Sequence, residues 1–590
     1  MQRVMHWLSA DQRRPVGLAL LALIGLCLVA FFNQLGALGL MDKTEGLFVE
    51  VPRQMLLSGD WVTPRWNGAT FFDYPVWGYW MVGLSFRLFG VSEWAARLPA
   101  ALAATATVLA LFAVVLQLAP AQEPWQPRIG RATLCASLLA LSPGWVGWGR
   151  SSVTDMFLSS SIALALLGFA LAYGAGDRVG LRRLGHGALA LFAGIAVLAK
   201  GPVGVLLPGL VILVFLLLKG QLLAQLRRTP WLAMIALFLG VIAPWYVLAT
   251  RANGTEFLSR FIGFSNLERF TSVLYSHPGP PWFYLPWVLI LLLPWSLFLP
   301  VAAARLRFWT LSSWRHAPSP ADLPLLALLW LVLIVAFFSA AATKLPGYIL
   351  PALPAGALLV GLLFQPLPRQ GDPLAQPLGA GLRLTGWINA ALLALMALAA
   401  ALAPRFLGND PSYPHFAEAV RGSGLPLLLA LPLLLAALAL AWLLLRPQGL
   451  QRLWLPNAAA FAAVLALVVP PLAPLIDRER QLPIRQLATL AARQALPREP
   501  LVVVGYKRYS VVFYSGRPAL FAGDPREALQ QLAAQPAAAQ ASPSVLLFGS
   551  DSELLHFGLG PGDGRLIGRL DAHQLVRIPI ARLRQLAERP

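Results

Sequence analysis

A polar and charged segment, MDKTEGLFVEVPRQMLLSGDWVTPRWNGATFFDYPVWGYW, occupies residues 41–80 of a chain that is otherwise mostly apolar. Its carboxylates follow a first hydrophobic stretch, and its tryptophan and tyrosine rings favour a membrane interface. The carboxylates belong to Asp42, Glu45, Glu50, Asp60 and Asp73. We interpret the segment as a loop on the bilayer that carries an active site. The alternative is a polar connector with an aromatic anchor belt.

The composition predicts a polytopic α-helical membrane protein, because 58% of the 590 residues are hydrophobic and only 12% are charged. The net charge of +20 comes from lysines and arginines scattered in short loops between apolar runs. Such residues orient membrane spans, so nucleic-acid binding is not favoured. Cys27 and Cys135 both fall within predicted spans, which argues against a disulfide framework and against a cysteine-based zinc site.

Apolar runs of the length that crosses a bilayer predict about thirteen transmembrane helices. The first run has a basic start, but it is long enough to span, so we expect a helix and not a cleaved signal. The predicted spans are 16–38, 96–118, 132–148, 156–174, 187–200, 203–218, 231–249, 283–303, 322–342, 347–363, 384–403, 424–445 and 453–470.

The distribution of charge between alternate loops predicts the orientation of these spans. Lysine and arginine gather in the loops on the side of the N-terminus, while acidic residues dominate the opposite side. The positive-inside rule then places the N-terminus in the cytoplasm. The long loops 41–95 and 250–282 and the C-terminal segment would all face outward.

Local patterns predict two helix features of the first outward loop. Residues Leu47, Val51 and Met55 recur at helical spacing within 45–58, which predicts an amphipathic helix lying on the membrane surface. Ser92 stands before an apolar run and predicts an N-cap for the second span, with Pro99 tolerated in its first turns.

Cations on the outward side run against the orientation rule and therefore need a reason. The loop 250–282 carries Arg251, Arg260, Arg269 and His277. An anionic ligand such as phosphate would explain them, because guanidinium matches phosphate geometry. Solvated pairing with glutamates of the same loop is the alternative.

Two short outward connections each carry a lysine, Lys200 and Lys344. Snorkelling of these lysines to the interface is the alternative to ligand binding. Tyr348 and Pro351 follow Lys344 and indicate a specifically shaped start to the next helix.

The character of the chain changes near residue 476. Residues 1–475 read as the membrane domain, and residues 476–590 have the charge density of a soluble domain. An amphipathic run, IRQLATLAARQAL, is followed by β-rich runs such as LVVVGY and SVLLFGS, which predicts a small α/β domain. No glycine-rich phosphate fingerprint or nucleophile elbow is present in it.

An ordered set of motifs carries a family resemblance from about residue 40 to residue 355. The motifs are MDKTEGLFVEVPRQMLLSGDWVTPRWNG, FFDYPVWGYW, LFGVSEWAARLPAAL, SSVTDMF, AKGPVG, HPGPPWFYLP and KLPGYILPALP. In these motifs the chain resembles the membrane glycosyltransferases of the 4-amino-4-deoxy-L-arabinose transferase and protein O-mannosyltransferase type. The resemblance implies the C-type glycosyltransferase fold, a bacterial inner-membrane location, a polyprenyl-phosphate sugar donor, and a lipid, glycan or protein acceptor.

The resemblance also implies roles for individual residues. Asp42 matches the catalytic aspartate of the family and would act as general base, and Asp155 matches a second catalytic-site aspartate, which would orient the acceptor or the donor. A departing lipid phosphate needs cations and hydrogen-bond donors. The substrate-binding candidates are Glu45, Tyr74, Lys344, Arg269 and Tyr348, with Lys200 ranked lower.

Tyr74 marks a departure from the family pattern. The family commonly has Glu-Lys-Pro where this chain has Asp73-Tyr74-Pro75, so a tyrosine replaces the lysine that would contact phosphate. Asp73 and His277 match positions where relatives hold a divalent metal, but two ligands are too few to establish a site.

Two other classes of protein remain open at this stage. A transporter or lipid flippase would need charged residues within its spans or matched broken helices, and few such features are visible. A scaffold for envelope assembly would not depend on Asp42.

Overall fold

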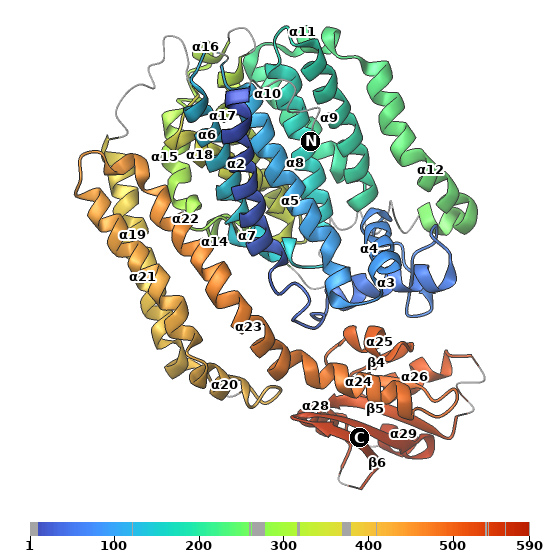
Figure 1. Ribbon diagram of the computed structural model, residues 1–590. Helices are drawn as coiled ribbons and strands as arrows, with labels where there is room; N and C mark the ends of the chain where they lie inside the picture. Colours follow the sequence, from blue (N-terminus) through green and yellow to red (C-terminus); the bar gives the residue numbers. More distant parts are fainter. Residues whose placement is uncertain are drawn as a thin grey trace.

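The structure, a computed structural model, describes residues 10–120, 122–258, 261, 278–315, 319–367, 379–408, 410–536, 540, 542–560 and 562–588. It has two parts (Figure 1). A large bundle of helices forms one part, and a smaller α/β unit made by the C-terminal residues lies beyond one end of it. We call this end of the bundle the site end.

Within the described ranges, ten helical stretches are long and apolar enough to cross a membrane, or twelve if each of two bent pairs is one span. The chain is therefore a multi-pass membrane protein. The ten stretches are Arg13–Phe32, α5 (Glu93–Leu118), α8 (Thr154–Gly174), α9 (Val179–Lys200), Trp231–Gly254 in α12 (Trp231–Leu258), Pro320–Ala340 ending in α17 (Leu323–Ala340), Pro346–Phe364 made by η5 (Pro346–Ala352) and α18 (Leu353–Phe364), α19 (Gly379–Phe406), α21 (Leu425–Leu444) and Gly449–Gln494.

The predicted count of thirteen spans is not confirmed, although each predicted run forms an apolar helix. Two runs are bent pairs: α6 (Trp125–Ala140) meets α7 (Pro143–Gly149) at 64°, and α14 (Tyr284–Leu291) meets Trp295–Arg305 at 114°. The residue before a proline disfavours helical dihedrals, and Ser142 before Pro143 is extended (ψ 123°). A third run forms α10 (Val203–Lys219), which is shorter than the spans.

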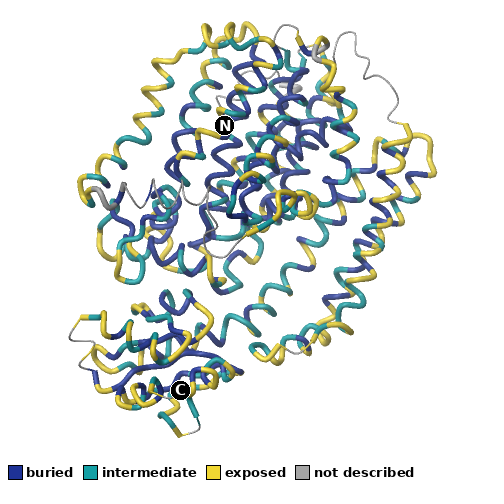
Figure 2. Tube along the Cα trace, turned by 180° about the vertical axis from the view of Figure 1, so that it is seen from behind, coloured by how far each residue is buried: buried dark blue, intermediate teal, exposed yellow. Residues whose placement is uncertain are grey.

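The outer shell of the bundle is apolar but exposed, as expected for helices that face lipid. Figure 2 shows exposed residues along the outer helices and buried residues in the middle of the bundle. In α12 and α21, for example, Leu232 is 85% exposed and Leu438 is 60% exposed. Cys27 and Cys135 are free and buried.

Short elements cover the site end of the bundle (Figure 1). They are α3 (Glu45–Ser58), α4 (Trp77–Phe89) and the hairpin of β1 (Arg65–Trp66) with β2 (Ala69–Thr70). The predicted helix 45–58 is confirmed, and it ends at Gly59, whose φ of +72° suits glycine. On its predicted apolar stripe Val51 and Met55 are buried, whereas Leu47 is only half-buried.

The predicted N-cap of the second span is also confirmed. The Ser92 hydroxyl accepts a hydrogen bond from the Ala95 amide at 3.2 Å, which satisfies one of the unpaired amides at the start of α5. Pro99 lies inside α5 near its start. The cap fixes where α5 begins and hence the position of its early residues.

The C-terminal unit confirms the predicted α/β fold. Its five-stranded sheet has the order β4-β3-β5-β7-β6, in which β3 is parallel to β4 and β5, and β7 is antiparallel to β5 and β6. The elements are α24 (Leu482–Gln494), β3 (Leu501–Val504), α25 (Ser510–Ser515), β4 (Ala519–Ala522), α26 (Pro525–Ala533), β5 (Ser544–Ser550), α28 (Asp551–His556), β6 (Arg565–Leu570), β7 (His573–Pro579) and α29 (Ile580–Glu588).

A continuous helical stretch, Gly449–Gln494, joins the bundle to this unit. The domain boundary that the sequence suggests at 475/476 falls inside this stretch, one residue before the end of α23 (Val469–Ile476), which η9 (Asp477–Gln481) follows directly. Because a helix links the two parts, the C-terminal unit is held against the site end (Figure 1).

Candidate active site

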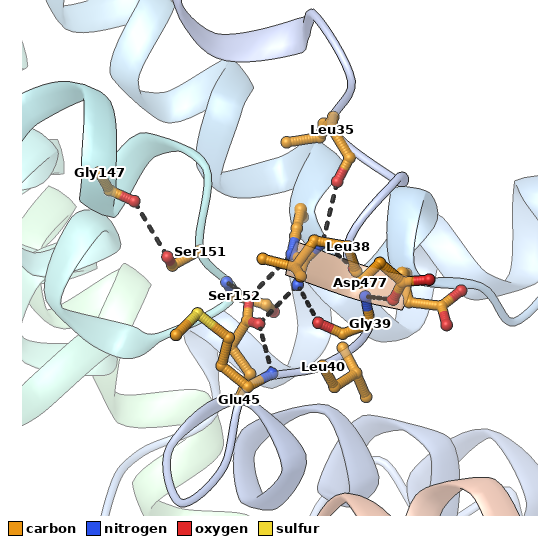
Figure 3. Close-up of polar contacts among 12 residues, drawn as sticks. Leu35, Leu38, Gly39, Leu40, Glu45, Gly147, Ser151, Ser152 and Asp477 are labelled. Atoms are coloured by element: carbon orange, nitrogen blue, oxygen red, sulfur yellow. Dashed lines mark hydrogen bonds and ion pairs between the residues drawn. The ribbon is translucent and has the colours of Figure 1, made fainter. Parts of the chain in front are cut away.

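The loop that follows the first span is held by Arg97 of α5. The Arg97 guanidinium donates to the backbone oxygens of Leu35 at 3.0 Å, Leu38 at 2.6 Å and Gly39 at 3.0 Å. Figure 3 shows the polar contacts of this loop converging on one point, and the Arg97 side chain there is buried. A guanidinium can serve several acceptors at once because its five N–H groups lie in a fixed plane. The loop therefore has a defined path up to Met41.

Glu45 completes this centre and joins it to the segment that precedes α8. Its carboxylate accepts from Arg97 at 2.9 and 2.7 Å, from the Met41 amide at 3.0 Å and from the Ser152 amide at 2.8 Å (Figure 3). Although burial opposes ionisation, Arg97 and these amides hold the pKa of Glu45 below its usual range.

The contacts of Glu45 correct its predicted role in substrate binding. A carboxylate has about four acceptor positions, and those of Glu45 are taken by the protein. It is also only 2% exposed. Glu45 instead ties the loop that carries Asp42 to the segment that precedes Asp155.

Asp42 lies between the bundle and the C-terminal unit. Its Oδ1 accepts from the Ser510 amide at 2.7 Å, and its Oδ2 accepts from the Ser510 hydroxyl at 2.8 Å. Burial raises the pKa of Asp42 to about 6, and the bonds from Ser510 partly offset that rise. A carboxylate with this pKa is ionised near neutral pH and still has useful proton affinity, as a general base requires.

Asp155 and Lys200 form a second centre with two of the predicted tyrosines. The Lys200 ammonium pairs with Asp155 Oδ1, and it lies 4.9 Å from the Tyr348 ring centroid and 5.7 Å from that of Tyr74. These four residues come from the start of α8, the end of α9, η5 and the loop before α4. The structure thus brings together four residues predicted from distant motifs.

The local fold explains why this pair forms at the site end. Asp155 lies in the first turn of α8, where the helix dipole favours a negative charge. Lys200 is the last residue of α9, and Gly201 with φ +86° breaks the helix directly after it. The break leaves the ammonium at a helix end, where cations are favoured.

Lys344 lies in a different setting. Its ammonium donates to the backbone oxygens of Ser339 at 2.8 Å and Ala341 at 2.6 Å, near the C-terminal end of α17, and lies 5.9 Å from the Tyr284 ring centroid. Burial lowers the pKa of Lys344. Two of its three protons serve backbone carbonyls, so the geometry favours Lys200 over Lys344 as phosphate ligand, the reverse of the ranking from sequence.

The predicted metal ligands remain a prediction. His277 and Arg269 lie outside the described residues, and so do Arg260 and Glu268 of the same loop. Asp73 is half-buried beside Tyr74. Across the part of the chain that the structure describes, no three His, Cys, Asp or Glu side chains are grouped so that they could hold a metal ion.

The sequence interpretation missed three residues of this site. Arg97 and Ser152 both fall within quoted motifs, so their place in those motifs was a usable signal. Ser510 lies 468 residues from Asp42 and belongs to a segment without a recognisable motif. Only the folded chain shows that contact.

Two family models match the chain. One, dolichyl-phosphate-mannose-protein mannosyltransferase, matches residues 73–247, and the other, the C-terminal domain of cyanobacterial RgtA-type glycosyltransferases, matches residues 494–590. The first match includes the Asp155 and Lys200 centre. The second contains Ser510.

Similar curated proteins are undecaprenyl phosphate-α-4-amino-4-deoxy-L-arabinose arabinosyl transferases. That of Pseudomonas paraeruginosa is 34% identical over 395 residues, which is 66% of each chain. That of Aeromonas hydrophila is 31% identical over 388 residues, or 65% of each chain. The matched stretch thus spans just under two thirds of the length of these relatives.

Solved structures extend the similarity of fold to almost the whole chain. Crystal structures of ArnT from Cupriavidus metallidurans align with a TM-score of 0.75 when bound to undecaprenyl phosphate and 0.72 in the apo state. The sequence identities are 24% and 23%, and each alignment covers 95% of this chain and 97% of the other. The family models, the curated relatives and this shared fold together identify the chain as one of the C-type membrane glycosyltransferases of the arabinose-transferase and protein-mannosyltransferase type.

Proposed function

We propose that this protein transfers a sugar from a polyprenyl-phosphate donor to a lipid acceptor at the outer face of the bacterial inner membrane. The observation that carries the proposal is the convergence of Asp155, Lys200, Tyr74 and Tyr348 at the site end of the bundle. Asp42 belongs to the same end, because Glu45 bonds both its neighbour Met41 and the Ser152 amide. The N-terminus would be cytoplasmic, and the C-terminal unit would face the periplasm.

Lys200 is the proposed ligand of the donor phosphate. Its ammonium has three protons, of which Asp155 takes one, and it lies over the rings of two tyrosines whose hydroxyls can donate to phosphate oxygens. A cation placed where negative charge grows on the leaving phosphate lowers the barrier to its departure. In this arrangement Asp155 orients Lys200.

Asp42 is the proposed general base. An acceptor hydroxyl attacks the anomeric carbon, a new C–O bond forms to the acceptor, and the bond from that carbon to the phosphate oxygen breaks. The hydroxyl proton passes to Asp42, and the electron pair leaves with the polyprenyl phosphate. Attack opposite to the leaving group inverts the anomeric centre.

The names of the curated relatives point to the donor. We propose undecaprenyl phosphate-α-4-amino-4-deoxy-L-arabinose as the first donor to test, because several relatives carry that substrate in their names. Lipid acceptors come first, with glycan and protein acceptors as alternatives. The transporter or flippase interpretation has no support from these relatives.

The test compares two aspartates of the same outward segment. Full-length protein in nanodiscs receives the donor and, in separate reactions, the lipid, glycan or protein fraction of a cell envelope, and mass spectrometry detects the product. We expect Asp42→Asn to lower transfer at least about 100-fold, as loss of a general base does. Asp60→Asn is the matched control, since the Asp60 carboxylate accepts from the Val62 and Thr63 amides of its own loop, both at 3.0 Å.

Near-normal transfer by the Asp42→Asn protein would remove Asp42 from the reaction. In reconstituted vesicles, movement of the donor lipid between leaflets without any glycosyl product would favour a flippase. If the wild-type protein formed a product with the protein or glycan fraction and none with the lipid fraction, the acceptor would be a protein or glycan and not a lipid.

A further inference from the structure

Residues beyond 476 hydrogen-bond the loop that carries Asp42 at three positions, namely Gly39, Leu40 and Asp42. Each contact joins this loop to a residue beyond 476, and none is a bond within the bundle. The Gly39 amide donates to Asp477 at 2.7 Å, the Leu40 amide donates to the Tyr514 hydroxyl at 2.8 Å, and Ser510 donates to Asp42 at 2.7 and 2.8 Å.

We propose that Ser510 is a positioning residue for the reaction: it orients the Asp42 carboxylate and keeps it ionised, so that the C-terminal unit completes the active site. This inference rests on the proposed role of Asp42 as general base. It gives the C-terminal unit a part in catalysis for which the sequence offers no motif.

The geometry suits orientation of a base. Ser510 fills one acceptor position on each carboxylate oxygen, so a position on each remains for a substrate hydroxyl. Two donors on two different oxygens also fix the plane of the carboxylate. Ser510 is 0% exposed, so water does not compete for its hydroxyl.

The close approach of α3 to α25 holds Ser510 in this place. A Cβ added at Gly46 would lie 2.5 Å from the Ser510 nitrogen, which is closer than real contacts allow. Glycine at position 46 therefore permits the C-terminal unit to approach the start of α3. The contact between Ser510 and Asp42 is built into the packing of two parts that are far apart in sequence.

Other charged groups near Asp42 already have partners. Arg508 is paired with Glu553 at 2.8 Å, and Glu45 is paired with Arg97 at 2.7 Å. The remaining titratable groups that face Asp42 are Tyr506 and Tyr509, and the neighbouring Lys43 lies 4.8 Å from the Tyr506 ring centroid. Ser510 thus supplies the hydrogen-bond donors that contact Asp42 directly. Arg508 and Glu45 act on the pKa of Asp42 only through charge, the first lowering it and the second raising it.

The experiment measures kcat/KM against pH for Ser510→Ala, Ser510→Cys and Ser510→Thr proteins in nanodiscs. The hydroxyl of Ser510 stabilises ionised Asp42, so its removal should raise the pH at which activity falls on the acid side by about one unit. We expect kcat to fall about tenfold in Ser510→Ala with KM for the donor unchanged. Ser510→Thr keeps the hydroxyl and should retain the wild-type profile, and Ser510→Cys, a weaker donor, should lie between them.

Tyr514→Phe is the matched control for a general weakening of the contact between the C-terminal unit and this loop. It removes the hydroxyl that bonds Leu40 and Glu93 but leaves both bonds from Ser510 to Asp42. We expect no shift of the acid limb in this variant. If Ser510→Ala protein does not fold, the comparison of Ser510→Cys with Ser510→Thr still tests the inference. The acid side of the kcat/KM profile should shift to higher pH in the Cys variant and stay in place in the Thr variant.

An unshifted acid limb in every folded Ser510 variant would overturn the inference, and so would an equal shift in Tyr514→Phe. The proposed function fails by a different result, since active Asp42→Asn protein would remove the base itself. If Asp42→Asn is inactive and the Ser510 variants behave as wild type, only the positioning role is wrong.

Discussion

Asp42 and Asp155 lie at the same end of the bundle, but different parts of the chain hold them. Asp155 pairs with the Lys200 ammonium, and both residues belong to membrane helices. Asp42 lies on a loop and accepts its direct bonds from an amide and a hydroxyl of the C-terminal unit. The Asp155 carboxylate is paired with a cation, whereas the Asp42 carboxylate is bonded by neutral donors.

This difference separates the two roles that the proposed reaction needs. A carboxylate in an ion pair would lose that pair if it took up a proton, so Asp155 is better suited to fixing Lys200 beside a phosphate than to acting as base. A carboxylate held by neutral donors can accept a proton without losing a charged partner. The pKa of about 6 at Asp42 agrees with that use.

The largest expected effect is on the Lys200 side of the comparison. Lys200→Met keeps an unbranched side chain but removes the ammonium near Tyr74 and Tyr348. We expect kcat for glycosyl transfer to fall by about 100- to 1,000-fold, as it does when a donor to developing negative charge is removed. Steady-state transfer assays in nanodiscs measure the loss.

Lys344→Met is the matched control for this change. The Lys344 ammonium serves the carbonyls of Ser339 and Ala341, so we expect mainly a loss of thermal stability and less than about a tenfold change in kcat. Equal losses of kcat in the two variants would mean that both lysines act on the substrate, and a larger loss in Lys344→Met would reverse the assignment.

Sequence patterns predicted what local physics determines. The helix 45–58, the Ser92 cap and the α/β character of the C-terminal unit follow from hydrophobic period, cap chemistry and β propensity, and all three are confirmed. The membrane bundle follows from apolar length, but the number of spans does not, because composition along one chain cannot show where a helix bends by 64° or 114°.

The site was predictable only in part for a similar reason. Asp155 and Lys200 were identified from separate motifs, but no spacing in the sequence shows that they pair. Glu45 was assigned to substrate binding from the family resemblance, which carries no information on burial. Burial beside Arg97, 52 residues away, reverses that interpretation.

A second prediction concerns Glu45, which connects the two carboxylates. Glu45→Gln keeps the shape of the side chain but leaves Arg97 buried without its counter-ion; the two side chains are 2% and 3% exposed. Breaking a buried pair in this way costs about 3–5 kcal/mol, so the melting temperature should fall. We also expect kcat to fall at least about tenfold, because the amide nitrogen of glutamine cannot accept two of the four hydrogen bonds by which Glu45 ties the Asp42 loop to Arg97 and Ser152.

The control for Glu45 is the buried pair of Glu123 with Arg131 near the opposite end of α5, at 2.5 Å. Glu123→Gln should lower the melting temperature to a similar extent and leave the kcat of the folded protein within about twofold, since it is remote from both acids. If both variants lose activity only in proportion to stability, Glu45 stabilises the fold and does not set the geometry of the site.

The smallest expected effect belongs to Tyr74, where the family commonly has a lysine. The Lys200 ammonium lies 5.7 Å from the Tyr74 ring centroid, so a cation already occupies the neighbourhood of the missing one. A second ammonium there adds attraction for the phosphate but is repelled by Lys200, and the two effects largely cancel. Tyr74→Lys alone should therefore change kcat/KM by no more than about threefold.

In the Lys200→Met background this repulsion is absent. The same substitution should then raise turnover about tenfold, because a lysine at position 74 replaces part of the lost charge from a different position. If Tyr74→Lys raised activity as much in the presence of Lys200 as in the Lys200→Met background, Lys200 would not be supplying the charge of the family's lysine. Another cation would then have to bind the phosphate, while Asp42 kept its role as base.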